Sequence, residues 1–160
     1  MNQVVMRYPR KERPVMSRAA RMPAAAEDVA QDHFIERDGE IFAGFHLIVD
    51  LWNGRGFDDQ DLLEGTLRRM VEVAGATLLH IHLHRFSPNG GISGVAVLAE
   101  SHISVHTWPE RGYAAFDVFM CGDARPHEAI AVLRHAFEPD TLRVEEFRRG
   151  RDATAEGAQT

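Results

Sequence analysis

Cysteine is almost missing from this 160-residue chain, which contains only Cys121. A single cysteine excludes an intramolecular disulfide and leaves one thiol free for chemistry. Long apolar runs are missing as well. None approaches the roughly 18 residues of a membrane-spanning helix, and the N-terminal segment lacks the apolar stretch of a secretory signal. We therefore expect a cytoplasmic protein without a membrane partner.

Net positive charge is also lacking. Lysine and arginine number 18 against 24 aspartates and glutamates, which gives a formal net charge of −6. The basic residues are concentrated within residues 1–21, so the remainder of the chain is strongly acidic. Nucleic-acid-binding domains usually have the opposite balance, so nucleic acid is not an expected partner. An acidic body suits a cationic ligand instead.

Hydrophobic periodicity is missing near both ends of the chain. Residues 1–38 carry prolines, an alanine run and several arginines, and we expect a mostly disordered basic arm there. A mitochondrial-type presequence is the alternative, because the arm is rich in arginine. Residues 39–150 have the apolar content of one folded domain. Residues 151–160 are expected to be a flexible tail.

Alternating and helical patterns fill the middle of the chain. Strands are expected at residues 45–51, 77–86, 93–99, 102–107, 113–121 and 142–147. One helix is expected after Asp58 and Asp59, which can cap it, and should end at Gly75. A second should run from Pro126, in its first turn, to Phe137.

The resulting order is β-α-β-β-β-β-α-β. It predicts an α+β fold, a two-layer sandwich in which two helices cover one face of a largely antiparallel sheet. We expect the opposite face to be apolar, so a second copy of the chain should cover it. The sequence therefore predicts a homodimer.

One segment has an unusual density of reactive side chains. Residues 99–110 are Ala-Glu-Ser-His-Ile-Ser-Val-His-Thr-Trp-Pro-Glu. In a strand, His102, Ser104 and His106 point to the same face. From the spacing alone, a solvated face of an edge strand is the commoner explanation of this pattern.

The wider sequence around this segment resembles a known family. The matching strings are His84-Arg85-Phe86, Gly94-Val95, Ala99-Glu100-Ser101-His102, His106-Thr107-Trp108-Pro109-Glu110, Gly112-Tyr113-Ala114-Ala115 and Cys121-Gly122. They closely resemble the prokaryotic S-adenosylmethionine decarboxylase proenzymes, which depend on a pyruvoyl group. The similarity extends more loosely from Gly44 to Gly150. The long N-terminal arm and the turn at residues 89–91 depart from the family pattern.

The resemblance implies self-cleavage between Glu100 and Ser101, which would give chains 1–100 and 101–160. The Ser101 hydroxyl would attack the Glu100 carbonyl, and residue 101 would end as a covalent pyruvoyl cofactor. This group forms a Schiff base with the substrate amine and acts as an electron sink.

The resemblance also implies roles for three further side chains. His106 would be the base of processing, Ser93 a possible assistant, and Cys121 the proton donor in turnover. A neutral imidazole and a protonated thiol are suited to these tasks near pH 7. Without the resemblance, an inert buried cysteine would be the default interpretation of Cys121.

The activity implied is decarboxylation of S-adenosylmethionine, which gives CO₂ and the aminopropyl donor of spermidine synthesis. Phe86 and Trp108 match family positions that line the nucleoside pocket, and Glu110 could accept hydrogen bonds from ribose hydroxyls. Aromatic faces suit an adenine ring or a sulfonium cation. Core packing or surface exposure remains the alternative for each of these residues.

Three other interpretations stay open. His80, His82 and His84 could bind a metal from one strand face, but the strand spreads them over about 13 Å, so we expect no metal site. A pyruvoyl enzyme of the same family could act on arginine or ornithine. An inactive relative could serve as an activating partner subunit, although the intact Ser101, His106 and Cys121 argue against it.

Overall fold

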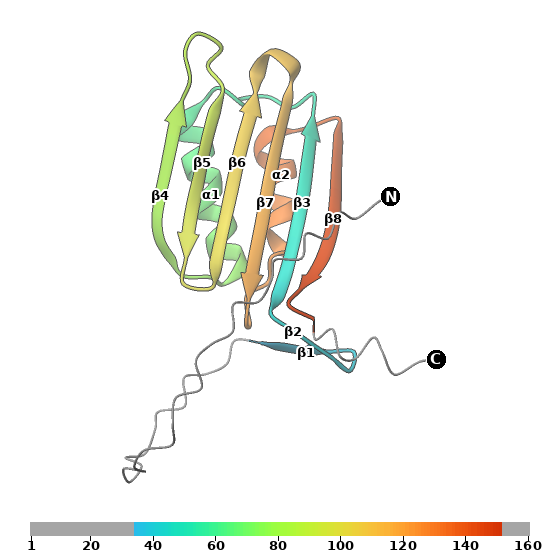
Figure 1. Ribbon diagram of the computed structural model, residues 1–160. Helices are drawn as coiled ribbons and strands as arrows, with labels where there is room; N and C mark the ends of the chain where they lie inside the picture. The colour runs from blue at the N-terminus through green and yellow to red at the C-terminus, as the bar shows by residue number, and fades with distance from the viewer. Residues whose placement is uncertain (1–33, 152–160) are drawn as a thin grey trace, which may run out of the picture. The chain divides into compact units, whose positions relative to one another are not determined.

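Six antiparallel strands form the main sheet of the protein (Figure 1). The computed structural model describes residues 34–151. The strands are β3 (Gly44–Trp52), β4 (Leu78–Arg85), β5 (Ile92–Leu98), β6 (Ser101–Trp108), β7 (Tyr113–Cys121) and β8 (Thr141–Arg149). Their order across the sheet is β4-β5-β6-β7-β3-β8. Strand β3 therefore lies beside β7 and β8, which come much later in the sequence.

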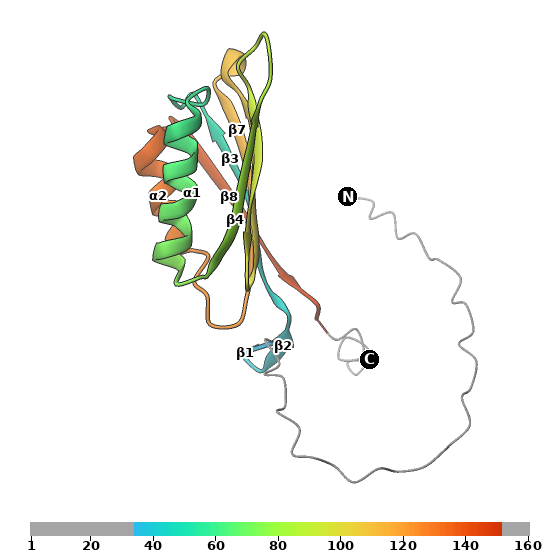
Figure 2. The same ribbon diagram turned by 90° about the vertical axis from the view of Figure 1, so that its left-hand side faces the viewer.

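Two helices, α1 (Gln60–Ala74) and α2 (Glu128–Phe137), lie on the same face of this sheet (Figure 2). The predicted α+β sandwich is confirmed. Asp59 caps α1 by accepting a hydrogen bond from the Leu62 backbone N–H at 3.0 Å, and Gly75 ends the helix as expected. Pro126 lies two residues before α2 rather than in its first turn.

The hydrophobic core fills the space between the helices and the sheet. Alternate residues of the central strands point inward and are fully buried, for example Leu47 in β3, Val105 in β6 and Val118 in β7. They pack against apolar side chains of the helices, such as Leu67 and Leu133. Period-two alternation in the strands and helical spacing in α1 and α2 therefore bury one continuous core.

The outer face of the sheet differs from the expected apolar surface. It is mixed polar and aromatic: the outward residues of β6 are His102, Ser104, His106 and Trp108, and β7 contributes Asp117 among others. An antiparallel sheet with helices on one face commonly has such a polar second face. The expectation of an apolar outer face is wrong, and a dimer has to be argued on other grounds.

A two-stranded sheet precedes the main one. It consists of β1 (Ile35–Arg37) and β2 (Glu40–Phe42), which pair across a turn at Asp38 and Gly39. Both turn residues have positive φ, 56° and 77°, as an Asp-Gly hairpin turn requires. The folded part thus begins before residue 39, where the arm was expected to end. The rest of that arm and residues 152–160 of the expected tail lie outside the described residues.

No helix within residues 34–151 is long and apolar enough to cross a membrane.

Candidate active site

The Glu100–Ser101 junction lies where the turn between β5 and β6 meets the first residue of β6 (Figure 1). Ser101 has φ +156°, outside the regions that residues with a side chain normally occupy. Such conformations cost about 1–3 kcal/mol and persist only where the surroundings enforce them. The backbone is therefore strained at the bond that the sequence predicts to break.

Cys121 holds the carbonyl group of this junction. Its backbone N–H donates to the Glu100 carbonyl oxygen at 3.2 Å, and its thiol donates to the same oxygen at 2.7 Å. The Ser101 hydroxyl lies 3.9 Å from the Cys121 sulfur. Two donors on one carbonyl oxygen, with a hydroxyl nearby, form the arrangement that stabilises an oxyanion.

The Glu100 side chain anchors the same turn from the other side. Its carboxylate accepts a hydrogen bond from the Thr77 backbone N–H at 2.9 Å, and the Thr77 carbonyl accepts one from the Ala99 N–H at 3.0 Å. These bonds fix the turn against the segment before β4. No pattern in the sequence pointed to Thr77, because the contact depends on how two distant turns meet.

Ser93 and His106 form a second cluster. They are opposite each other on β5 and β6, and the Ser93 Oγ lies 2.7 Å from the His106 Nδ1. This pair is exposed on the outer face, and the His106 ring lies 6.3 Å from that of Trp108. A hydroxyl bonded to an imidazole can fix the ring and help it to take or pass a proton.

The expected substrate residues gather at the same end of the sheet as His106. Phe86 follows β4 and is 50% exposed, and Trp108 at the end of β6 is 40% exposed. Gly91 lies between the two strands, bonded through its carbonyl to the Phe86 N–H and close to the Thr107 carbonyl. Gly91 is buried, and a Cβ there would lie 2.8 Å from the Thr107 carbonyl oxygen, so the turn before β5 packs directly against the end of β6. Glu110 is exposed on the short 3₁₀ helix η1 (Pro109–Arg111) that follows.

The two clusters do not meet within one chain. Ser101 and His106 are five residues apart on β6, which corresponds to about 17 Å along an extended strand, and Trp108 is about 23 Å from Ser101. A proton transfer requires hydrogen-bond distance, or one intervening water. The structure therefore joins Glu100, Ser101 and Cys121 at one end of β6, and Ser93, His106 and Trp108 towards the other.

A polar network lies on the outer face between the clusters, and the sequence analysis missed it. Asp117 on β7 accepts a hydrogen bond from Ser104 at 2.9 Å and lies 3.5 Å from the His46 Nε2 on β3. The Arg149 guanidinium lies 3.0 Å from the other ring nitrogen of His46. Burial lowers the pKa of His46 and Arg149 lowers it further, against the opposing effect of Asp117. His46 is therefore held as a neutral imidazole at neutral pH.

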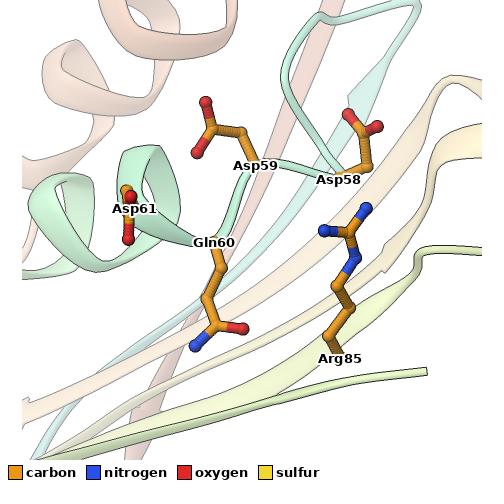
Figure 3. A pocket seen from close by; sticks show the side chains of 5 residues that line it. All are labelled: Asp58, Asp59, Gln60, Asp61 and Arg85. Carbon is orange, nitrogen blue, oxygen red and sulfur yellow. The ribbon is translucent and has the colours of Figure 1, made fainter.

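An open depression of about 530 Å³ lies at the N-terminus of α1 and the end of β4 (Figure 3). Asp58, Asp59, Gln60, Asp61 and Arg85 line it. Arg85 points towards Asp58, while Asp59 and Asp61 point elsewhere (Figure 3). Asp59 caps α1 and Asp61 lies in its first turn, so both have a role in the helix itself. The depression contains none of the residues expected in the site.

His80, His82 and His84 lie in a line along β4, opposite Val97, Val95 and Ser93 of β5. Among residues 34–151, no three His, Cys, Asp or Glu side chains are close enough together to hold a metal ion. The structure offers no support for the metal alternative.

Comparison with known proteins shows which family the chain is similar to. A family model described as S-adenosylmethionine decarboxylase matches residues 45–150. The S-adenosylmethionine decarboxylase proenzyme of Methanococcus vannielii is 48% identical over 110 residues, which cover 67% of this chain and 89% of that protein. The proenzyme of Thermomicrobium roseum is 44% identical over 108 residues, covering 67% and 93%.

One solved structure of the same family is also similar to this chain. The crystal structure of the adenosylmethionine decarboxylase from Aquifex aeolicus is similar with a TM-score of 0.63 and 33% identity, over 68% of this chain and 92% of that one. These matches define the class of the protein as a carboxy-lyase. The chain belongs to the S-adenosylmethionine decarboxylase family, and the resemblance seen in the sequence is confirmed.

Proposed function

We propose that this chain is a self-processing, pyruvoyl-dependent S-adenosylmethionine decarboxylase that cleaves itself between Glu100 and Ser101. The products of turnover are CO₂ and decarboxylated S-adenosylmethionine, the aminopropyl donor for spermidine. The observation that carries the proposal is the pair of hydrogen bonds to the Glu100 carbonyl oxygen. This oxygen accepts hydrogen bonds from both the N–H and the thiol of Cys121, beside the strained Ser101.

Self-cleavage follows from this geometry in ordinary chemical steps. The Ser101 oxygen attacks the Glu100 carbonyl carbon, and the two Cys121 donors stabilise the negative oxygen that forms. Collapse breaks the C–N bond, so an ester replaces the amide and relieves the strain at Ser101. A base then removes the α-proton of residue 101, and the Glu100 carboxylate leaves. Water replaces the nitrogen of the remaining dehydroalanine, which releases ammonia and leaves a ketone.

The residues around position 101 fit a pyruvoyl group. After the cut, residue 101 would begin a chain whose strand pairing with β7 is intact, because Ser101 pairs with Met120 and His102 with Phe119. The new terminus would thus stay beside Cys121. The pyruvoyl ketone would supply the electron sink for decarboxylation. The Cys121 thiol would supply the proton that replaces CO₂.

We further propose that the enzyme is a homodimer in which each copy completes the other's site. His106 is about 17 Å from Ser101 in its own chain, so it cannot act there. A two-fold axis across the strands, near Ser104, exchanges the two ends of β6 when two outer faces meet. Ser101 of one copy then faces Ser93 and His106 of the other. The polar outer face suits such an arrangement, because it holds site residues rather than only packing surface.

The exposed rings of Phe86 and Trp108 favour S-adenosylmethionine over arginine or ornithine. A purine offers a larger flat aromatic surface for stacking than the guanidinium of arginine, and ornithine has no planar side-chain group. Glu110, two residues after Trp108 on η1, is exposed and available to ribose hydroxyls.

Two measurements test the proposal. Intact mass of freshly purified protein should show two pieces, residues 1–100 and a blocked 101–160, and Ser101→Ala should stay whole because no hydroxyl remains to attack. Release of CO₂ should occur with S-adenosylmethionine and not with arginine or ornithine. A wild-type chain that stays full-length on incubation would contradict self-processing, and CO₂ from ornithine or arginine alone would contradict the substrate.

A further inference from the structure

A row of three aromatic rings crosses the outer face at the Trp108 end of the sheet. Trp52 on β3 pairs with Tyr113 on β7, which pairs with Trp108 on β6. The rings are stacked: the Trp52 and Tyr113 centroids are 4.4 Å apart with planes at 29°, and the Tyr113 and Trp108 centroids are 5.3 Å apart with planes at 28°. Trp52 is 42% exposed, so the row is a surface feature rather than part of the core.

Asp50 fixes the middle ring of this row. The Tyr113 hydroxyl donates to the Asp50 carboxylate at 2.5 Å. Burial and the Asp50 hydrogen bond raise the pKa of Tyr113 to about 12, so the phenol keeps its proton and remains a donor. A bond to a carboxylate is stronger than one between neutral groups. Tyr113 is therefore held at two points, through its hydroxyl by Asp50 and through its faces by the indoles.

Trp108 gains its orientation from this arrangement. One face of its indole stacks on Tyr113, and the ring is 40% exposed, so part of it remains open to a ligand. A half-exposed tryptophan at the end of a strand would otherwise lose side-chain freedom when a ligand binds, and that loss weakens affinity. A Trp108 ring that is already held by stacking loses little side-chain freedom when a ligand binds.

We infer that Tyr113, locked by Asp50 and backed by Trp52, is a positioning residue that presents the free face of Trp108 to the adenine of the substrate. This inference rests on the proposed function, because it assigns Trp108 to the nucleoside. It adds residues that take no part in making the pyruvoyl group. Disturbing them should weaken nucleoside binding and leave self-cleavage unchanged.

The chain offers a direct optical readout of the row. It has two tryptophans in all, Trp52 and Trp108, and both belong to the row. In Trp52→Phe, Trp108 is the sole tryptophan, and its fluorescence reports stacking by a nucleoside without any need for turnover. The probe is 5′-methylthioadenosine, which has the adenosine part of the substrate and no amino-acid carboxylate.

The experiment compares Tyr113→Leu and Tyr113→Phe in the Trp52→Phe background. Losing the ring should weaken probe binding about tenfold, the upper range for loss of an aromatic pair. Tyr113→Phe keeps the ring and should lose less, about threefold. In the chain with Trp52 intact, the same substitutions should raise KM for S-adenosylmethionine by similar factors, leave kcat within about threefold and leave the cleaved fraction unchanged. Ser104→Ala, which breaks the other hydroxyl–carboxylate pair of this face, is the matched control and should bind the probe as the parent does.

Asp50→Asn keeps every ring and should weaken probe binding about threefold by weakening the bond to Tyr113. It serves as the second variant if Tyr113→Leu loses folded protein. Probe binding equal to that of the parent in Tyr113→Leu, or in Asp50→Asn where the first does not fold, would overturn the inference while the proposed function stood. A parent protein that neither binds the probe nor decarboxylates S-adenosylmethionine would overturn both.

Discussion

At the scale of single residues, Cys121 has two separable roles in the proposed chemistry, one in self-cleavage and one in turnover. Its backbone N–H and its thiol both bond to the Glu100 carbonyl, so both are placed to stabilise the oxyanion of self-cleavage. Substitution of the side chain removes the thiol and keeps the N–H. The thiol is also the acid proposed for turnover, where no backbone group can replace it.

Cys121→Ala should therefore process slowly but turn over very poorly. We expect cleavage to be completed on longer incubation, because one oxyanion donor remains. Decarboxylation should fall by about 10²–10⁴-fold, the usual effect of losing a positioned proton donor. Protonation at the wrong carbon would transfer the substrate amine to the pyruvoyl group, so mass spectrometry should find N-terminal alanine accumulating on the 101–160 chain.

Cys121→Ser is the matched control for this prediction, since a hydroxyl restores the second donor to the carbonyl. It should process faster than Cys121→Ala and still turn over slowly, because a hydroxyl is a far weaker acid than a thiol. Fully processed Cys121→Ala that decarboxylates S-adenosylmethionine at the wild-type rate, without inactivation, would show that the thiol is not the acid.

At the scale of elements, sequence patterns predicted what depends on neighbours along the chain. The strands and α1 follow from alternation, helical spacing and the Asp59 cap. The Ser93–His106 contact joins two consecutive strands, and the family motif identified both residues. The β1–β2 hairpin was missed although Asp38-Gly39 is a hairpin signal, because the flanking runs are only three residues long.

Contacts between strands that are distant in sequence could not be predicted in this way. His46 meets Asp117, and Asp50 meets Tyr113, only because β3 lies beside β7. Nothing in either strand's own sequence specifies that neighbour. For the same reason the outer face was expected to be apolar: its polar residues are spread over several strands and gather only in the assembled sheet.

The network around His46 leads to a prediction about pH. Its pKa is lowered from 6.5, chiefly by burial, so the unfolded chain binds a proton at His46 more readily than the folded protein does. Stability is therefore lost as pH falls through 6.5 towards the lower pKa of the folded state. His46→Gln removes the titrating group and can still bond to Asp117 and Arg149.

The melting temperature of Ser101→Ala, which stays uncleaved, should fall between pH 7.5 and 5.5, and adding His46→Gln should make that fall smaller. Circular dichroism at one fixed protein concentration measures both. His135→Gln, at an exposed position of α2, is the control and should leave the fall unchanged. Superimposable curves for His46→Gln and its parent would contradict the prediction.

At the scale of the whole molecule, the residues predicted for the site lie at the two ends of β6. The family motif is contiguous in sequence, which suggests a contiguous site, yet an extended strand separates its residues by about 3.3 Å each. Ser101 and His106 are thus close in sequence and too far apart in one chain to exchange a proton. A second copy resolves this only if the two ends of the strand are exchanged between copies.

A site shared between two copies predicts that two variants, each unable to process itself, can restore processing in a mixed dimer. A site within one chain does not predict this. Ser101→Ala keeps His106 but has no hydroxyl to attack. His106→Ala keeps Ser101 but has no base, and should stop as whole chain or as an ester that hydroxylamine cleaves. Each variant alone lacks one group at every site. In a mixed dimer, however, one site combines Ser101 of the His106→Ala chain with His106 of the Ser101→Ala chain.

Co-expression of the two variants with different affinity tags, followed by purification over both tags, isolates the mixed dimers. Mass spectrometry should find the pyruvoyl-blocked 101–160 fragment from the His106→Ala chain only, while the Ser101→Ala chain stays whole. Replacing the partner by the double variant Ser101→Ala/His106→Ala should abolish the fragment, because no His106 then remains in the dimer. An uncut His106→Ala chain in mixed dimers would contradict the shared site. Formation of the same blocked fragment by His106→Ala alone would instead remove His106 from the processing chemistry, and with it the reason for placing that residue opposite Ser101 of a partner.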